Sequence, residues 1–216
     1  MQAEPTWKTA CYPWENPAMI SQPNSLLQRS EFTLGILAGG TGRRVGHRDK
    51  GLLVGSGQTL VERTVSQNRG IFGEVIVCCH GNPWFYSMLA DRVLCDSRPG
   101  LGPLMGIAAL LSGTETEFLA VIPCDQQRLP AWWLNHMFEA MDNSVLGVYA
   151  TEAGRHTACC LLRRGARPRV EELLKNKERS LGALFEQPEF SGVEAASMGC
   201  DIDYLSDLRS EASAAS

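Results

Sequence analysis

The chain has 216 residues, of which 44% are hydrophobic and 20% are charged, and its formal net charge at pH 7 is −4. This size and composition are typical of one globular domain, and the negative charge argues against a nucleic-acid-binding surface, which needs a basic footprint. The sequence has no apolar run near the roughly 18 residues of a membrane helix, and no basic segment followed by an apolar core at its start. We therefore expect a cytoplasmic domain that contacts neither membranes nor nucleic acid.

Residues 1–31 contain four prolines and show no helical or strand period, which predicts a disordered extension. An apolar run at 32–37 predicts a buried strand. Downstream, the pattern predicts strands at 74–79, 92–95, 118–122, 145–150 and 158–162, and helices at 59–69, 84–90, 104–112, 130–141, 170–175 and 204–209. Strands that alternate with helices indicate a mostly parallel central sheet that is covered on both faces. We expect one domain over residues 32–210, followed by a tail at 211–216.

A glycine-rich loop follows the first predicted strand. It has four glycines (Gly39, Gly40, Gly42 and Gly46), with Arg43 and Arg44 set among them and Lys50 after them. Without a Cβ, backbone N–H groups can approach an anion closely, and the basic side chains add charge-assisted donors for phosphate oxygens. The spacing matches neither the Gly-x-Gly-x-x-Gly dinucleotide fingerprint nor the Walker pattern. From these residues alone, a phosphate-binding loop and a basic surface loop both remain open.

Carboxylates follow two other predicted strands. Asp96 comes directly after the strand at 92–95, and Asp125 closes the run Val-Ile-Pro-Cys-Asp after the strand at 118–122. Ligands of open α/β sheets bind beyond the carboxyl ends of the strands, so we expect both acids and the glycine-rich loop on one rim. A carboxylate at the position of Asp125 suits Mg²⁺, and a cap for the helix predicted at 130–141 is the alternative.

The eight cysteines do not have the spacing of a zinc site, because no Cys-x-x-Cys occurs. Two adjacent pairs, Cys78-Cys79 and Cys159-Cys160, lie inside apolar runs. Free thiols that pack as small hydrophobic groups are therefore expected, in keeping with a reducing compartment.

Residues 37–51 read Leu-Ala-Gly-Gly-Thr-Gly-Arg-Arg-Val-Gly-His-Arg-Asp-Lys-Gly. This resembles the pyrophosphorylase-type nucleotidyltransferase signature Leu-Ala-Gly-Gly-x-x-x-Arg-Met-Gly-x-x-Asp-Lys, with Val45 in place of Met. The paired glycines and the Asp before the Lys are most similar to the molybdenum cofactor guanylyltransferase family. The stretch from Asp96 to Ile107 and the Pro-Cys-Asp that ends at Asp125 extend the resemblance, which spans about residues 32–210.

The resemblance implies a three-layer α/β/α Rossmann-like nucleotidyltransferase fold. It also implies transfer of GMP from GTP to molybdopterin-bound molybdenum (Mo-molybdopterin), with release of pyrophosphate and formation of the molybdopterin guanine dinucleotide cofactor. The nucleophile is then the terminal phosphate of molybdopterin and not a side chain. Mg²⁺ is the implied cofactor, and a molybdoenzyme or its chaperone is the implied protein partner.

By the same resemblance, Arg44, Lys50 and Asp125 are catalytic, with the two cations on the triphosphate, where negative charge builds up. Asp125 is the implied metal ligand. The implied nucleotide-binding residues are Leu37, Ala38, Gly39, Gly40, Lys50, Asp96 and Asp125. His156, Asp201 and Asp203 are implied to line the pterin side.

The sequence departs from the family pattern at two places. Asp201-Ile-Asp203 stands where guanylyltransferases have Asn-x-Asn-Thr-Pro and is similar to the cytidylyltransferase branch, and Cys78 stands where an Asn is expected. The alternatives are therefore a molybdenum cofactor cytidylyltransferase, a nucleotidyltransferase that acts on a sugar phosphate or another phosphate, and a degenerate nucleotide-binding module without activity. The glycine pair and the Asp49-Lys50 pair favour the guanylyltransferase.

Overall fold

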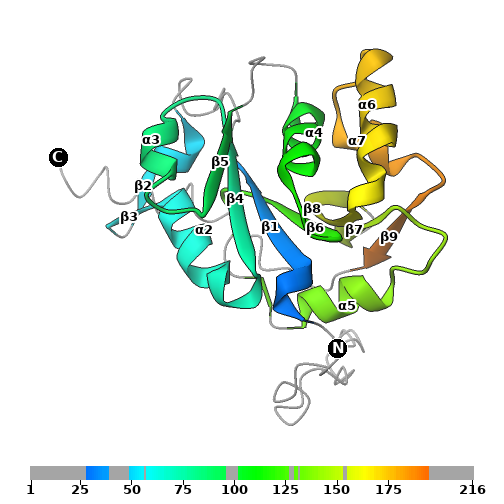
Figure 1. Ribbon diagram of the computed structural model, residues 1–216, viewed down its shortest axis with the longest axis horizontal. Helices are drawn as coiled ribbons and strands as arrows, with labels where there is room; N and C mark the ends of the chain where they lie inside the picture. The colour runs from blue at the N-terminus through cyan, green and yellow to red at the C-terminus, as the bar shows by residue number, and fades with distance from the viewer. Residues whose placement is uncertain are drawn as a thin grey trace, which may run out of the picture.

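The computed structural model describes residues 28–38, 49–55, 57–95, 102–126, 129–130, 132–152 and 155–194. A seven-stranded sheet in the order β5-β4-β1-β6-β8-β7-β9 forms the centre of this part of the chain (Figure 1). The strands are β1 (Phe32–Leu37), β4 (Glu74–Cys79), β5 (Arg92–Cys95), β6 (Phe118–Pro123), β7 (Gly147–Glu152), β8 (Arg155–Arg163) and β9 (Phe190–Glu194). Among these seven, β8 alone runs antiparallel to its two neighbours, so the prediction of a mostly parallel sheet is confirmed.

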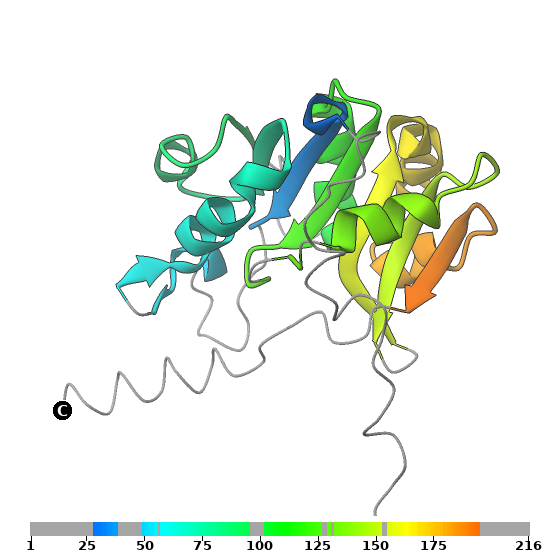
Figure 2. The same ribbon diagram turned by 90° about the horizontal axis from the view of Figure 1, so that it is seen from below.

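Helices cover both faces of the sheet (Figures 1 and 2). On one face lie α2 (Leu60–Asn68), α3 (Pro83–Tyr86) and α5 (Trp133–Glu139). On the other lie α4 (Pro103–Gly113), α6 (Arg167–Lys175) and α7 (Leu181–Phe185). Each face has its own hydrophobic cluster, which confirms the three-layer α/β/α fold.

Shorter elements connect these layers. They are the 3₁₀ helices η3 (Arg29–Glu31), η5 (Lys50–Leu52), η6 (Arg69–Ile71) and η7 (Arg164–Ala166), and the two-stranded ribbon β2 (Val54–Gly55) and β3 (Gln58–Thr59). α2 begins with a capping box, in which Thr59 Oγ1 accepts from the Glu62 N–H and Glu62 Oε2 accepts from the Thr59 N–H. This cap starts α2 directly after the ribbon.

β1 lies inside the sheet, between β4 and β6, and its successive residues face the two helical layers in turn. Phe32, Leu34 and Ile36 are fully buried in the cluster that includes α2 and α5. Gly35 faces α4, and a Cβ added there would lie 2.8 Å from Leu110 Cδ1. The missing side chain therefore lets α4 approach the sheet closely.

The predicted strands 32–37, 74–79 and 92–95 agree with β1, β4 and β5. The predicted helix 130–141 is shorter in the structure, because α5 starts at Trp133. The sequence analysis did not predict α7 or β9. The signal for α7 was present: Ser180 Oγ accepts from the Ala183 N–H as an N-cap, and the buried residues Leu181, Leu184 and Phe185 follow at helical spacing.

Residues 1–27 and 195–216 lie outside the described residues, and so does the helix predicted at 204–209. The domain boundaries at 31 and 210 and the tail at 211–216 therefore stay predictions. In the part of the chain that is described, no helix has both the length and the apolar character needed to cross a bilayer.

We expect Gly73→Ala to lower the free energy of unfolding by about 1–3 kcal/mol, as overpacking does. A Cβ at position 73 would lie 2.7 Å from the Arg29 carbonyl oxygen and 2.9 Å from Ser30 Cα, which are backbone atoms that cannot rotate away. Gly70→Ala is the matched control, because nothing lies within 4 Å of its added carbon. Urea denaturation measures both variants. Equal stabilities would contradict the packing of residues 29–30 against the start of β4.

Candidate functional site

The carboxyl ends of β1 and β6 lie next to each other, with Leu37 in register with Pro123. Backbone hydrogen bonds continue beyond the strands: the Cys124 N–H donates to the Leu37 carbonyl (3.1 Å), and the Ala38 N–H donates to the Cys78 carbonyl (2.8 Å). The chain order reverses here, because β4 and β5 lie on one side of β1 and β6 lies on the other. Open α/β sheets bind ligands at such a switch point.

An ion pair occupies this switch point. Lys50 Nζ, in η5, donates to Oδ2 of Asp125, which follows β6 and is 75 residues away in the sequence. The two side chains are 37% and 38% exposed, so solvent and ligands can reach both. A half-exposed ion pair contributes little to stability, so either member can exchange its partner at small cost. A ligand that brings both negative charge and a metal ion would offer a new partner to each.

Asp49 fixes the start of η5. Its Oδ1 accepts hydrogen bonds from the Gly51 N–H (3.1 Å) and from the Tyr86 hydroxyl (2.6 Å), and its Oδ2 accepts from Asn82 Nδ2 (3.3 Å). Tyr86 is fully buried in α3. Burial, followed by the hydrogen bond to Asp49, raises the pKa of Tyr86 well above its ordinary value, so the hydroxyl remains a donor at physiological pH. The lysine-bearing turn is thus attached to α3.

The loop that carries Asp125 is held by α2. Thr64 Oγ1 lies 2.8 Å from the Cys124 carbonyl oxygen and 3.0 Å from the Gln126 carbonyl oxygen, which flank Asp125 in the sequence. The single hydroxyl proton is shared between these two acceptors and the Leu60 carbonyl. This hydroxyl is buried, as is the backbone around it. The position of Asp125 therefore depends on a side chain in a different layer of the fold.

Asn68 completes the anchor one turn further along α2. Its Nδ2 donates to the Thr64 carbonyl (2.8 Å), and its Oδ1 accepts from the Leu129 N–H (2.8 Å). Sequence reasoning missed both Thr64 and Asn68. The available signal was two polar residues four apart on the face of a predicted helix that also carries Leu60, Val61 and Val65.

Cys124 precedes Asp125 and is buried. Burial, with a contribution from the charge of Asp125, raises the pKa of Cys124 to about 12, so the thiol is protonated at neutral pH and is not a nucleophile. Five of the six described cysteines are buried free thiols as expected, and Cys95 at the end of β5 departs from this by being exposed. Within the described residues, no three His, Cys, Asp or Glu side chains gather into a metal-binding group.

Residues 34–190 match the family model of the MobA-like NTP transferase domain, which is more than half of the chain. This chain belongs to the MobA-like NTP transferase family. It is 32% identical to the molybdenum cofactor guanylyltransferase of Pseudomonas fluorescens over 162 residues, which are 74% of this chain and 81% of that protein. The resemblance found in the sequence is thereby confirmed.

Solved structures share the fold of this MobA-like chain. Molybdopterin-guanine dinucleotide biosynthesis protein A from Archaeoglobus fulgidus superimposes with a TM-score of 0.62 at 17% identity, over 75% of this chain and 83% of that one. The 4-diphosphocytidyl-2C-methyl-D-erythritol synthase from Anaerococcus prevotii gives 0.61 at 10% identity, over 80% and 90% of the two chains. Because enzymes with different names share this fold, the fold alone does not select the nucleotide.

Of the other residues that the sequence singled out in this MobA-like chain, the structure describes Leu37 and His156. Leu37 packs against α4, since a Cβ on Gly106 would lie 2.6 Å from Leu37 Cδ2. His156 is paired in register with Thr151 of β7, which places its backbone on the carboxyl edge of β7 and β6. The remaining ones lie outside the described residues: Gly39, Gly40, Arg44, Asp96, Asp201 and Asp203.

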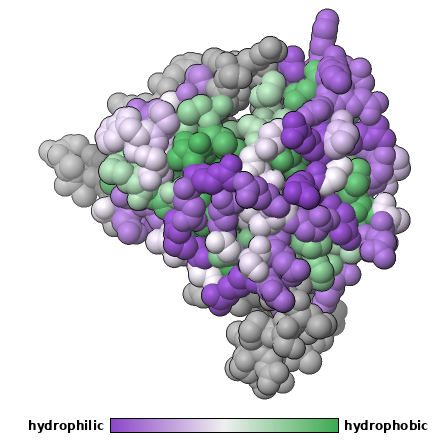
Figure 3. Space-filling view, in the orientation of Figure 1, coloured by the Kyte–Doolittle hydropathy of each residue, from purple (hydrophilic) through white to green (hydrophobic). Residues whose placement is uncertain are grey.

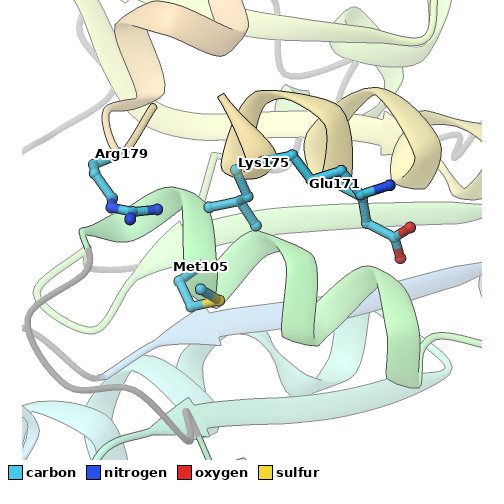
Figure 4. A pocket seen from close by; sticks show the side chains of 5 residues that line it. Met105, Glu171, Lys175 and Arg179 are labelled. Atoms are coloured by element: carbon cyan, nitrogen blue, oxygen red, sulfur yellow. The ribbon is translucent and has the colours of Figure 1, made fainter. Parts of the chain in front are cut away.

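A separate cavity of about 330 Å³ lies between α4 and α6 (Figure 4). Met105, Glu171, Leu174, Lys175 and Arg179 line it. None of the described site residues contributes to its wall, so it is distinct from the Lys50–Asp125 site. The Arg179 carbonyl also accepts from the Leu104 N–H (3.3 Å), which joins the turn after α6 to the start of α4.

Hydrophilic side chains cover most of the face shown in Figure 3, and hydrophobic ones gather toward α3 and β5. Trp84 in α3 and Met88 just after it are 67% and 65% exposed, whereas Tyr86 between them is fully buried. The short helix α3 therefore turns Tyr86 inward to Asp49 and Trp84 outward to solvent.

We expect Asn68→Ala to lower the free energy of unfolding by about 2–3 kcal/mol, because it leaves the Leu129 N–H without its acceptor inside the protein. Gln67→Ala, next to it on the exposed side of α2, is the matched control and should change stability by less than about 0.5 kcal/mol. Chemical denaturation measures both. A loss of equal size in the two variants would show that Asn68 does not anchor the Asp125 loop.

Proposed function

We propose that this chain transfers GMP from GTP to Mo-molybdopterin in the presence of Mg²⁺ and releases pyrophosphate. The observation that carries the proposal is the Lys50–Asp125 pair at the switch point between β1 and β6. An accessible cation can stabilise charge on the phosphates, and an accessible carboxylate can hold the metal ion that nucleotidyl transfer uses. Membership of an NTP transferase family, and a relative named for guanylyl transfer, supply the reaction class.

Lys50 binds the triphosphate in this proposal. A lysine ammonium is a compact point charge, and negative charge builds up on the departing pyrophosphate in the transition state. Lys50 leaves Asp125 to reach those oxygens, which costs little because the ion pair is half exposed. Arg44, in the same glycine-rich loop, adds a second cation.

Asp125 is the proposed ligand of the divalent metal ion. Mg²⁺ is usually bound by one or two carboxylates together with substrate phosphates and water, so a single accessible aspartate at the phosphate site fits it. Triphosphate oxygens and water are the proposed sources of further ligands. When bound, the ion neutralises phosphate charge and aligns the triphosphate for in-line attack.

The attacking atom is an oxygen of the terminal phosphate of molybdopterin. It forms a bond to the α-phosphorus of GTP, the bond from that phosphorus to the bridging oxygen breaks, and pyrophosphate leaves. No side-chain nucleophile is required, which agrees with the protonated, buried Cys124 beside Asp125. The task of the protein is to position the two substrates and stabilise charge.

The remaining assignments are proposals on the same basis. Backbone groups of Leu37, Ala38, Gly39 and Gly40 cradle the nucleotide, and Asp96 contributes to its recognition. A carboxylate can accept from both the N1–H and the N2 amine of guanine. His156, Asp201 and Asp203 belong to the pterin side, and a molybdoenzyme or its chaperone receives the product.

We expect Lys50→Ala to lower kcat/KM for GTP by roughly 10²–10³-fold, the usual effect of removing one group that stabilises transition-state charge. Lys177→Asn is the control, because it removes an exposed lysine on the turn after α6 and Asn tolerates the left-handed backbone there (φ 66°). Pyrophosphate release with GTP and Mo-molybdopterin measures both. Equal activity of Lys50→Ala and the wild type would contradict the assignment.

Calorimetry with GTP, CTP, ATP and UTP, each with Mg²⁺, tests the nucleotide. We expect selective GTP binding, and we expect Asp125→Ala to remove the dependence of binding on Mg²⁺ because the carboxylate ligand is lost. Glu139→Gln, an exposed acid at the end of α5, is the control and should retain that dependence. A preference for CTP would replace the guanylyl assignment by the cytidylyl one. Binding of none of the four nucleotides would overturn the assignment as a nucleotidyltransferase.

A further inference from the structure

The Lys50 side chain is held from two directions. Its ammonium group pairs with Asp125, on the loop that Thr64 of α2 anchors. Its backbone opens η5, which Asp49 caps. The Leu52 N–H donates to the Asp49 carbonyl and the Leu53 N–H donates to the Lys50 carbonyl, both at 3.2 Å. When nucleotide phosphates take the ammonium away from Asp125, the backbone attachment alone fixes where Lys50 points.

That backbone attachment leads to one buried side chain. Asp49 caps η5 through the Gly51 N–H, and the same Oδ1 atom accepts the Tyr86 hydroxyl at 2.6 Å. Gly51 packs against this hydroxyl so closely that an added Cβ would lie 2.5 Å from Tyr86 Oη. Tyr86 itself is fully enclosed in the core cluster with α2 and β4, so its hydroxyl is a fixed point of attachment for Asp49.

The contact also holds Asp49 in its working orientation. A carboxylate that accepts from a buried hydroxyl and from a backbone N–H of its own turn has few other rotamers that satisfy both donors. Asn82 adds a third hydrogen bond, to the other oxygen, from a residue in the left-handed region (φ 54°) directly before α3. The arrangement ties the turn of Lys50 to α3 and, through α3, to the core.

We infer that Tyr86 is a positioning residue for nucleotidyl transfer: through its hydrogen bond to Asp49 it holds the η5 turn so that Lys50 reaches the triphosphate. The inference rests on the proposed function for the role of Lys50. It concerns a residue that touches neither substrate and that acts only through Asp49. Its effect therefore falls on the alignment of charge in the transition state more than on the binding of GTP.

Tyr86→Phe removes the hydroxyl and keeps the ring. We expect kcat for pyrophosphate release to fall about tenfold while KM for GTP changes less than about threefold, because a displaced lysine still attracts the triphosphate but stabilises the leaving charge poorly. Tyr149→Phe is the matched control; its ring stacks on Phe185 on the other face of the sheet, and it should keep wild-type kcat. A Tyr86→Phe enzyme with wild-type kcat would overturn the inference.

A double-mutant cycle separates positioning from general damage to the core. If Tyr86 acts through Asp49, Tyr86→Phe has its full effect on kcat in the wild type and little further effect in Asp49→Ala. If the two effects on kcat multiply, Tyr86 does not act through Asp49 and the inference fails. Asn82→Gly serves as a second variant should Tyr86→Phe fold poorly; it keeps the left-handed backbone, removes one donor, and should lower kcat about two- to threefold.

A measurement independent of turnover distinguishes failure of this inference from failure of the proposed function. Competitive acetylation followed by peptide mass spectrometry reports the reactivity of Lys50, with Lys175 on α6 as the internal reference. We expect Tyr86→Phe to raise the reactivity of Lys50 about threefold relative to Lys175, since the loosened turn exposes the ammonium group. Unchanged reactivity of Lys50 in Tyr86→Phe overturns the positioning role. If the variant shows the shift but the wild-type protein makes no product from GTP and Mo-molybdopterin, the proposed function alone fails.

Discussion

The parallel pairing of β1 with β6 is the interaction on which the candidate site depends. It places the end of the first strand beside Pro123, although the two strands are separated in the sequence by two other strands of the same sheet. The pairing is buried on both faces, so a shift of one residue would move Leu34 and Ile36 out of their cluster. Hydrophobic register thus fixes where the Asp125 loop begins relative to the end of β1.

Around this fixed edge, the functional groups are held by polar side chains that come from the helical layer. Thr64 and Asn68 of α2 support the Asp125 loop, and Tyr86 of α3 supports the Lys50 turn. Buried polar groups are costly unless they are hydrogen-bonded, and each of these makes at least one hydrogen bond to the backbone of the Asp125 loop or to the Asp49 carboxylate. The same layer therefore supplies both the hydrophobic packing and the orientation of the charged pair, which half-exposed ion pairing alone would not provide.

Much of the fold and part of the site could be predicted from local patterns. The apolar runs of β1, β4 and β5, the alternation with helices, and the signature from Leu37 to Lys50 are visible without any structure, and the family they indicated is confirmed. β9 was missed because its five residues carry little periodicity, and α7 was missed although its N-cap Ser180 and the apolar residues after it mark a short helix. Thr64, Asn68 and Tyr86 were missed because a polar residue in a helix has meaning only when its distant partner is known.

The sequence by itself determined the class of the chain: which segments are apolar enough to form a buried sheet, and which loop carries the glycines and cations of an NTP transferase. These are local properties of composition and spacing, so neighbouring residues suffice to show them. Only the tertiary structure decided that Lys50 pairs with Asp125, that α2 holds the Asp125 loop, and that α3 holds the Lys50 turn. Those contacts join residues that are tens of positions apart, and the order of strands in the sheet, not the sequence around each residue, brings them together.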